Sequence, residues 1–314
     1  MTFCEIIEKL EAIGATDPQA EAFVILESLF GVSRAAIMAN KTQGYDSPAL
    51  DSLIEKRKAR VPLQHSLGEW EFMGKKFYVS CDCLIPRPDT EILVEKALDI
   101  IKKRTQGGVF DEKCKMQNAK CKMDNPSVSA ADSSLYTREP LNGCISVADL
   151  CTGSGCIGLS LMMYGNVEKM TLMDISEGAI KMAQQNAKLH GLYDRCEFIL
   201  GDITKNMPRC QFDLIVSNPP YIPTKDIDGL SEEVKKEPML ALDGGEDGLD
   251  IIRFLIGDCL SYLKENGAML IEFGYDQGEI MDTLLRQKCH TGSIKSYEIL
   301  KDYGNNPRVA CIYK

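Results

Sequence analysis

Four consecutive residues of this chain, Asn218-Pro219-Pro220-Tyr221, combine groups that can hold a planar amino group. They follow an apolar run over residues 212–217 that predicts a buried strand, and two prolines cannot continue the hydrogen-bond ladder of a sheet. The chain must therefore leave the sheet here with an amide side chain, prolyl carbonyls and an aromatic ring, at a strand end of the kind where open α/β sheets place ligands. None of these side chains is a base near neutral pH, so the motif does not indicate proton abstraction. A glutamine amide and the amino groups of adenine and guanine all remain eligible.

A glycine-rich turn stands between a predicted strand over residues 145–150 and a predicted helix over residues 156–164. Its glycines let the backbone turn tightly and approach a ligand without a Cβ in the way. The Gly-x-Gly-x-x-Gly spacing also matches a dinucleotide fingerprint, but no hydride-transfer constellation follows it. Asp149, just before the turn, is placed to accept hydrogen bonds through water from an ammonium group. The residues of this turn that we expect to bind a cofactor are Asp149, Cys151, Thr152, Gly153, Ser154 and Gly155.

Two further acidic residues end predicted strands. Asp174 ends one strand, where a carboxylate can hold both hydroxyls of a ribose. Asp202 ends the next, where it can accept from an adenine amino group while Ile203 packs against the ring. The alternative is that each acid only caps the following helix, which Ser176 makes a real option for Asp174. Because these features and the tetrapeptide occupy four successive strand ends, we expect one cofactor site, with Asn218 also contacting the cofactor.

The region from residue 145 onward alternates strands with helices, which indicates a mostly parallel sheet covered on both faces. Only residues 302–307 separate the last two predicted strands, too few for a crossover helix, so these should pair antiparallel. Six parallel strands with one inserted antiparallel strand is the α/β, Rossmann-like layout of methyltransferases. The predicted strands are 145–150, 169–174, 196–201, 212–217, 268–273, 296–301 and 308–313, and the predicted helices are 156–164, 176–190, 248–264 and 276–288.

The residues before this sheet divide into two parts. Residues 1–66 show helical spacing with Ser/Asp-Pro start signals, and we expect a small helical domain that packs against the rest of the chain or binds something. Residues 67–90 read as a β-hairpin with Met73-Gly74 at its turn, followed by a proline-rich linker. The remaining residues, 91–314, would form the catalytic domain.

Two polar stretches have open interpretations. Residues 104–144 are polar and carry a basic tract, which indicates either RNA contact or, as we favour because aromatic residues are nearly absent, a flexible solvated insertion. Residues 237–249 are acidic and rich in glycine, and are as consistent with a lid over the site as with an ordinary loop.

Composition excludes several classes of protein. The 314 residues carry a net charge of −10, which argues against a general nucleic-acid footprint, so we expect no direct nucleic-acid partner. No apolar run approaches the ~20 residues that a membrane span needs. Thirteen cysteines without a Cys-x-x-Cys pair, and only three histidines, favour a reducing cytoplasm and no metal site.

The order of motifs along nearly the whole chain resembles the peptide chain release factor glutamine N5-methyltransferases (HemK/PrmC type). Residues 104–144 are the exception, since the family has a short linker there. Residues 84–91 are more diagnostic than the tetrapeptide, which adenine N6-methyltransferases share. The matching motifs are Arg60-x-Pro62-Leu63-Gln64, Leu67-Gly68, Phe72, Leu84-Ile85-Pro86-Arg87-Pro88-Asp89-Thr90-Glu91, the glycine-rich turn, Asn218 to Pro223, Glu237-Pro238, Ala241-Leu242 and Gly245-x-x-Gly248-Leu249.

The resemblance implies an enzyme with S-adenosyl-L-methionine as methyl donor and S-adenosyl-L-homocysteine as product. It implies that the acceptor is the glutamine amide of the Gly-Gly-Gln motif in class 1 release factors, and that the N-terminal helical domain grips the release factor. Asn218, Pro219, Pro220 and Tyr221 would then bind the acceptor and act in catalysis. The alternatives are a DNA or RNA adenine N6-methyltransferase, which would use the same tetrapeptide on a flipped base, and a non-catalytic cofactor-binding scaffold.

Overall fold

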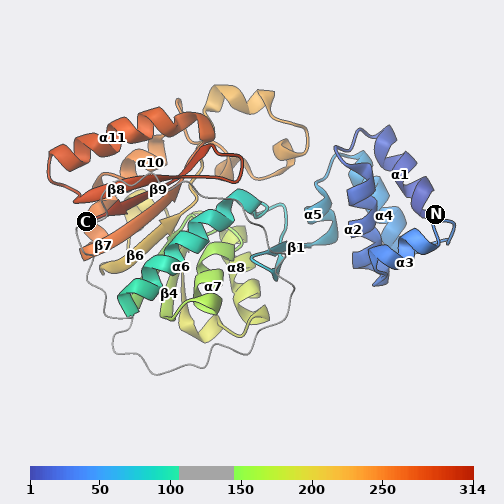
Figure 1. The fold of residues 1–314 in the computed structure, drawn as a ribbon, viewed down its shortest axis with the longest axis horizontal. Coiled ribbons are helices and arrows are strands. Elements are labelled where there is room, and N and C mark those ends of the chain that lie inside the picture. The colour runs from blue at the N-terminus through green and yellow to red at the C-terminus, as the bar shows by residue number, and fades with distance from the viewer. Residues whose placement is uncertain (106–144) are drawn as a thin grey trace, which may run out of the picture.

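The computed structural model describes residues 1–105 and 145–314, so most of the polar insertion expected at 104–144 lies outside the described residues. Five helices form the N-terminal region, which Figure 1 shows in blue beside the sheet rather than against either of its faces. Asp17, Ser33 and Ser47 cap three of these helices, as their sequence predicts, because each side chain accepts a backbone N–H of the first turn. The helices are α1 Phe3–Ala12, α2 Pro18–Phe30, α3 Arg34–Ala39, α4 Pro48–Lys58 and α5 Leu63–Leu67.

A hairpin joins the helical region to the rest of the chain. Strands β1 (Glu69–Phe72) and β2 (Lys75–Tyr78) pair antiparallel around Met73 and Gly74, both at positive φ, as a tight hairpin turn requires. The buried Asn186 side chain fixes the hairpin, because it accepts from the Tyr78 N–H at 2.7 Å and donates to the Tyr78 carbonyl at 2.9 Å. The hairpin is therefore held against the helix that carries Asn186.

Seven strands form the main sheet in the order β5-β4-β3-β6-β7-β9-β8. The first five run parallel, and β9 pairs antiparallel with both β7 and β8, so that it is inserted between them as the sequence predicts. This is the expected α/β, Rossmann-like arrangement. The strands are β3 Ile145–Leu150, β4 Val167–Asp174, β5 Cys196–Leu200, β6 Phe212–Ser217, β7 Leu263–Glu272, β8 Ser296–Lys301 and β9 Pro307–Tyr313.

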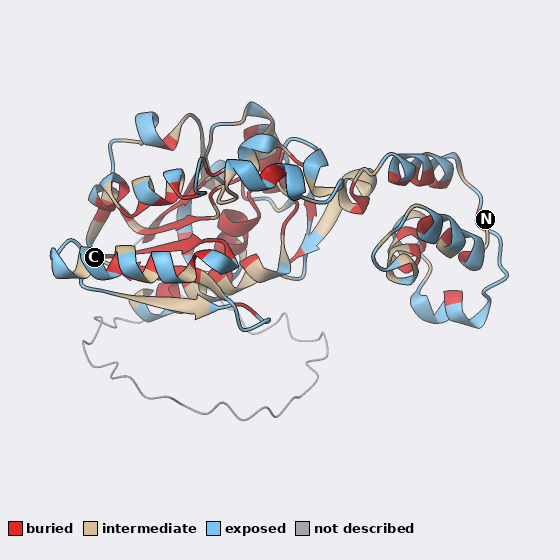
Figure 2. Cartoon of the chain, turned by 90° about the horizontal axis from the view of Figure 1, so that it is seen from above, coloured by how far each residue is buried: buried red, intermediate tan, exposed pale blue. Residues whose placement is uncertain are grey.

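Alternating side chains of the strands build a hydrophobic core on each face of the sheet. Leu214 and Leu270 join the core beneath α6, α7 and α8, while Ile215 and Ile271 join the core beneath α10 and α11. Figure 2 shows these buried strands between helices whose outer surfaces are exposed. The α-helices of this part are α6 Glu91–Thr105, α7 Cys156–Tyr164, α8 Glu177–Leu189, α9 Ile203–Asn206, α10 Asp250–Leu255 and α11 Gly278–His290. The short 3-10 helices are η1 Pro88–Thr90, η2 Tyr193–Arg195, η3 Thr224–Gly229, η4 Val234–Lys236, η5 Met239–Ala241, η6 Asp258–Tyr262 and η7 Tyr275–Gln277.

One sequence-based element is wrong in its extent. The single helix expected over 248–264 is instead α10, then η6, and β7 already begins at Leu263. Gly257 ends the first helical segment with a backbone conformation that a helix does not use. Leu263 pairs with Phe212, and the register of the ladder then shifts before pairing resumes at Ala268. The residues between Leu263 and Ala268 are mostly polar, so the sequence pattern placed the start of the strand too late.

A buried arginine connects the N-terminal helices to the part of the chain that forms the main sheet. Arg57, on α4, has a fully buried side chain and binds both carboxylate oxygens of Glu21 at 2.9 and 3.0 Å. The same guanidinium reaches Glu233, beside η4, at 2.9 Å. Because a buried charge must be paired, this contact fixes the loop before Glu237 relative to the helical region.

Candidate active site

The turn after β3 folds back so that its backbone faces a pocket at the carboxyl ends of the parallel strands. Cys151, Gly153 and Gly155 adopt positive φ angles of 59°, 54° and 79°. A non-glycine residue in this conformation is strained, and such strain gathers at ligand sites. Thr152 fixes the turn by donating its N–H to the Met173 carbonyl at 3.1 Å.

Asp149 holds this turn from behind. Its side chain is fully buried, and Oδ2 accepts from the Thr152 hydroxyl at 2.7 Å and from the Gly158 N–H at 2.9 Å. Burial raises its pKa to about 7, and these two hydrogen bonds oppose the shift. Asp149 does not line the pocket, and its carboxylate binds residues of the turn.

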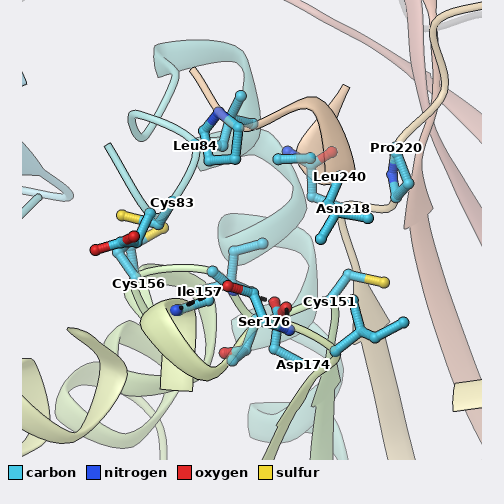
Figure 3. A pocket seen from close by; sticks show the side chains of 18 of the residues that line it. Cys83, Leu84, Cys151, Cys156, Ile157, Asp174, Ser176, Asn218, Pro220 and Leu240 are labelled. Carbon is cyan, nitrogen blue, oxygen red and sulfur yellow. Dashed lines mark hydrogen bonds between the residues drawn. The ribbon is translucent and has the colours of Figure 1, made fainter. Parts of the chain in front are cut away.

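Asp174, at the end of β4, lines the pocket with a fixed carboxylate. Oδ2 accepts from the Gly153 N–H and Oδ1 from the Ser176 N–H, both at 2.9 Å. The cap of α8 is the Ser176 hydroxyl, which accepts from Ala179. Burial raises the pKa of Asp174, and the backbone hydrogen bonds lower it. The carboxylate therefore keeps lone pairs for a ligand hydroxyl at the floor of the pocket (Figure 3).

Asp202 and Ile203 form another part of the wall. The Asp202 side chain caps α9 by accepting from the N–H and hydroxyl of Thr204, and it pairs with Lys205 at 2.8 Å. These contacts, the Lys205 hydrogen bond first, lower its pKa to about 2, so it is a carboxylate at neutral pH. Ile203 is buried and presents an apolar surface beside it. The capping function considered in the sequence is thus present at Asp202, together with a place on the pocket wall.

Asn218 enters the pocket from the end of β6 with a defined orientation. Its Nδ2 donates to the Thr90 hydroxyl at 3.3 Å, while its Oδ1 is buried and has no partner among the described residues. A buried acceptor without a partner is costly, and such an atom at a pocket wall indicates a donor supplied by a ligand. Figure 3 shows Asn218 and Pro220 on one side of the pocket, with Leu240 next to them.

The outer wall comes from two segments that are distant in sequence, residues 82–87 and 238–243. The Glu237 carboxylate joins them, because it accepts from the Ile85 N–H at 2.9 Å and pairs with Arg87. The second segment is itself bound to the chain after the tetrapeptide, through Ile222 N–H to Leu242 at 3.0 Å and Gly244 N–H to Ile222 at 2.9 Å. These contacts hold the start of the 237–249 loop in place at the mouth of the pocket.

The structure brings most of the predicted site residues together, but not all. Pro219, Tyr221, Gly155 and Asp149 are not among the lining residues. The Tyr221 hydroxyl points instead to Glu272, at 3.4 Å from Oε1, and its carbonyl accepts from Gln277 at 2.9 Å. The predicted residues that line the pocket are Cys151, Thr152, Gly153, Ser154, Asp174, Asp202, Ile203, Asn218 and Pro220.

The sequence analysis gave no individual role to three residues that lie in or next to the site. Thr90 ends η1 and accepts a hydrogen bond from Asn218, 128 residues away. Glu237 binds a segment 152 residues away. Glu272 ends β7, and the signal that would have found it is the one used for Asp174 and Asp202, an acid directly after an apolar strand.

The strand order, the strained turn and the acids at strand ends define a Rossmann-like methyltransferase. The Methyltransferase small domain model matches residues 136–237, and the PrmC N-terminal domain model matches residues 5–68. The fold is also similar to the hMettl16 catalytic domain, solved in complex with MAT2A 3'UTR hairpin 6, with a TM-score of 0.55, 14% identity, and coverage of 82% of this chain and 81% of that one.

Curated relatives define the family more narrowly. A release factor glutamine methyltransferase of Moorella thermoacetica is 33% identical over 99% of this chain and 96% of its own length. Another, of Aquifex aeolicus, is 30% identical over 97% of this chain and 93% of its own length. The chain belongs to the release factor glutamine methyltransferase family.

Proposed function

We propose that this protein transfers a methyl group from S-adenosyl-L-methionine to the side-chain amide nitrogen (N5) of the glutamine in the Gly-Gly-Gln motif of class 1 release factors. It would act in the cytoplasm, on a component of translation termination. The names of its relatives support the substrate. The observation that carries the chemistry is the buried Oδ1 of Asn218, which has no partner among the described residues.

The pocket suits the methyl donor. The carboxylate of Asp174 is oriented for ribose hydroxyls, and Asp202 with Ile203 offers an acceptor and an apolar surface for adenine. The 151–154 turn lines the pocket and leaves room for the amino-acid part of the donor. When bound, S-adenosyl-L-methionine supplies an electrophilic methyl group on a sulfonium, and S-adenosyl-L-homocysteine is the product.

An amide nitrogen is a poor nucleophile, because its lone pair is delocalised into the carbonyl. Asn218 Oδ1 accepts one N–H of the substrate amide, and the Pro219 carbonyl accepts the other. Two acceptors orient the nitrogen and stabilise the positive charge that develops on it. Pro220 keeps the corner rigid, and the apolar wall excludes water. The methylated nitrogen then loses its proton to water, so no dedicated base is required.

The decisive experiment is intact-mass analysis of a purified release factor after incubation with the protein and S-adenosyl-L-methionine. We expect the mass of one methyl group on the Gly-Gly-Gln peptide. A release factor with glutamate in place of that glutamine is the matched control, because it lacks the amide nitrogen, and it should remain unmodified. Methyl transfer to DNA or RNA but not to the release factor would refute the proposal in favour of an adenine methyltransferase.

The variant Asn218→Ala tests how the nitrogen is held. We expect turnover to fall about 100- to 1000-fold, as when a preorganised hydrogen-bonding group is removed from an active site. Binding of S-adenosyl-L-homocysteine, measured by calorimetry, should weaken only modestly. Near wild-type methylation by this variant would show that another residue holds the acceptor amide.

A further inference from the structure

The Glu233 carboxylate joins the N-terminal helices to the part of the chain that forms the main sheet. Figure 1 shows these helices beside the sheet, with strand β1 of the hairpin between the two parts. Among the described residues, every ion pair between residues 1–66 and residues 145–314 ends on Glu233. Arg57 approaches this carboxylate at 2.9 Å and Arg60 at 4.0 Å. The charged link between the two parts therefore depends on one side chain.

Arg57 is fixed in place by contacts within the helical region alone. Glu21 binds its guanidinium side-on, with Nε and Nη2 at 3.0 and 2.9 Å from the two carboxylate oxygens. Nη1 donates to the Val61 carbonyl at 2.7 Å. A planar guanidinium held at several of its donors keeps a defined orientation. Nη2 has a second proton, and it donates this proton to Glu233 Oε1 at 2.9 Å.

The bond to Glu233 is not needed to neutralise Arg57. The Arg57 side chain is fully buried, so its charge requires a counter-ion, and Glu21 already supplies one. Glu233 brings a second carboxylate, whose side chain is 33% exposed and could be solvated instead. What this contact adds is therefore a fixed position for the loop that carries Glu233.

A short turn connects Glu233 with the pocket. Glu233 and Glu237 stand at the two ends of η4, and the Glu237 N–H donates to the Val234 carbonyl at 2.9 Å within it. At its far end, Glu237 accepts from the Ile85 N–H at 2.9 Å and pairs with Arg87. The turn is thus held at both ends, by the N-terminal helices and by the other segment of the outer wall.

The residues directly after this turn form the outer wall of the pocket at 238–243. Pro238 and Leu240 line the pocket, and Figure 3 shows Leu240 next to Asn218. Because Pro238 follows the turn immediately, a displacement of the turn moves this wall as well. The position of Leu240 against Asn218 therefore depends on where Glu233 is held.

We propose that Arg57 is a positioning residue for the pocket, which holds Glu233 and, through the η4 turn, the wall at residues 238–243 around the methyl donor. The inference rests on the proposed function for the identity of the donor and the acceptor. It gives the N-terminal helices a part in shaping the pocket, although residues 1–66 contribute no side chain to its lining.

The first test compares Glu233→Ala, Glu233→Gln and Glu232→Ala. Alanine removes the acceptor but leaves Arg57 paired with Glu21, so the change leaves no buried charge without a partner. Glutamine keeps an oxygen that can accept from Nη2 and should behave almost as wild type. Glu232 is the matched control, because it is exposed and pairs with Lys235 on the same turn.

Amide hydrogen exchange gives a readout that needs no substrate. In Glu233→Ala, exchange at residues 234–243 should become about 3- to 10-fold faster, as expected for the loss of one hydrogen bond that holds a local segment. Exchange in the core strand β6 should stay as in the wild type, and Glu233→Gln and Glu232→Ala should show no change. Unchanged exchange at 234–243 in Glu233→Ala, or an equal rise throughout the protein, would overturn the inference.

Two further variants identify the arginine that acts. A lysine at position 57 has one ammonium group in place of the guanidinium fork, so it cannot hold Glu21 side-on while it also reaches Glu233. Arg57→Lys should therefore speed exchange at 234–243 as Glu233→Ala does. Arg60 is 40% exposed and more distant, so Arg60→Lys should have no such effect. A larger effect of Arg60→Lys would assign the positioning to Arg60 and refute it for Arg57.

The affinity for the cofactor product measures the consequence for the pocket. In Glu233→Ala, binding of S-adenosyl-L-homocysteine should weaken about 3- to 10-fold by calorimetry, within the range of changes that act on a site from a distance. KM for the donor should rise by a similar factor while kcat changes little, because a bound donor favours the closed wall. Glu233→Gln and Glu232→Ala should retain the wild-type affinity.

Wild-type affinity in Glu233→Ala, or equal losses in all three glutamate variants, would contradict the positioning. The same measurements separate it from the proposed function. If the wild-type protein fails to methylate a release factor while the exchange rates and affinities follow the expected order, the proposed acceptor is wrong and the positioning by Arg57 stands.

Discussion

The side-chain carboxylate of Glu237 accepts a hydrogen bond at 2.9 Å from the backbone N–H of Ile85, which lies 152 residues earlier in the chain. The other carboxylate oxygen pairs with Arg87. One side chain therefore holds together the two segments that form the outer wall of the pocket. Several consequences of this and of related contacts are open to measurement.

Replacement of Glu237 should open the pocket wall. Glu237→Ala leaves the Ile85 N–H without a partner and Arg87 without its counter-ion, so we expect the free energy of unfolding to fall by about 1 to 3 kcal/mol. The affinity for S-adenosyl-L-homocysteine should fall as well, because both segments line the pocket proposed to bind it. Urea denaturation and calorimetry measure the two effects. The exposed Glu232→Ala serves as control, and equal effects of both changes would contradict the assignment.

Asp174 should contribute more to cofactor affinity than Asp202 does. Asp174→Asn loses the charge that holds the Gly153 N–H and a ribose hydroxyl, a change of about 1.5 to 3 kcal/mol, or about 10- to 100-fold in affinity. Asp202→Asn should have a smaller effect, since the Asp202 carboxylate is shared with Lys205 near the surface. Isothermal titration with S-adenosyl-L-homocysteine compares them. Unchanged affinity in Asp174→Asn would place the ribose elsewhere.

A side chain at Gly248 should damage the loop behind the tetrapeptide. A Cβ there would lie 2.3 Å from the Tyr221 carbonyl oxygen, and the residue has a φ of 77°. Gly292→Ala is a matched control, because Gly292 has a φ of 74° but no atom within 4 Å of the added carbon. We expect about 1 to 2 kcal/mol of destabilisation for the control from its backbone conformation alone and clearly more for Gly248→Ala. Thermal unfolding of both variants gives the comparison, and similar losses would remove the steric explanation.

Two buried carboxyl groups should make stability depend on pH. Burial raises the pKa of Asp149 and of Glu272 to about 7, from ordinary values of 3.8 and 4.5. Between about pH 4 and pH 7 the folded protein therefore binds more protons than the unfolded chain, so these groups make the free energy of unfolding fall as the pH rises through that window. The shift at Glu272 corresponds to at most about 3 kcal/mol.

Glu272→Gln removes one of these groups and checks the sign. Its stability relative to wild type should improve as the pH is raised from 5 to 8. The same substitution at the exposed Glu265 should show no such trend. A relative stability of Glu272→Gln that falls with rising pH would mean that the carboxyl group is better stabilised in the folded state than its burial implies.

Much of the fold follows from local signals. Apolar runs marked the strands, and Ser or Asp followed by proline marked helix starts, because both signals act within a few residues. The same signals led to Asp174 and Asn218, both of which line the pocket. They failed where polar residues interrupt β7, since periodicity there reflects a break in register rather than an element boundary.

Contacts between distant segments of the chain have no comparable local sequence signal. The bond between Thr90 and Asn218 joins residues that are 128 positions apart, and nothing in either segment specifies the partner. Asp149, expected to accept hydrogen bonds through water from an ammonium group, has its Oδ2 bound to Thr152 and Gly158 within the turn. Which face of a turn a side chain occupies depends on backbone angles that composition alone does not set.

The inserted position of β9 has a consequence for how the protein is made. Every residue of the pocket is translated before β9, yet β9 is the strand that separates and pairs with both β7 and β8. Until residues 307–313 emerge from the ribosome, two strand edges stay unpaired, and such edges invite pairing with other chains. A chain that stopped at residue 306 would thus carry a complete pocket lining and still be prone to aggregate, because β7 and β8 would each keep an uncovered edge.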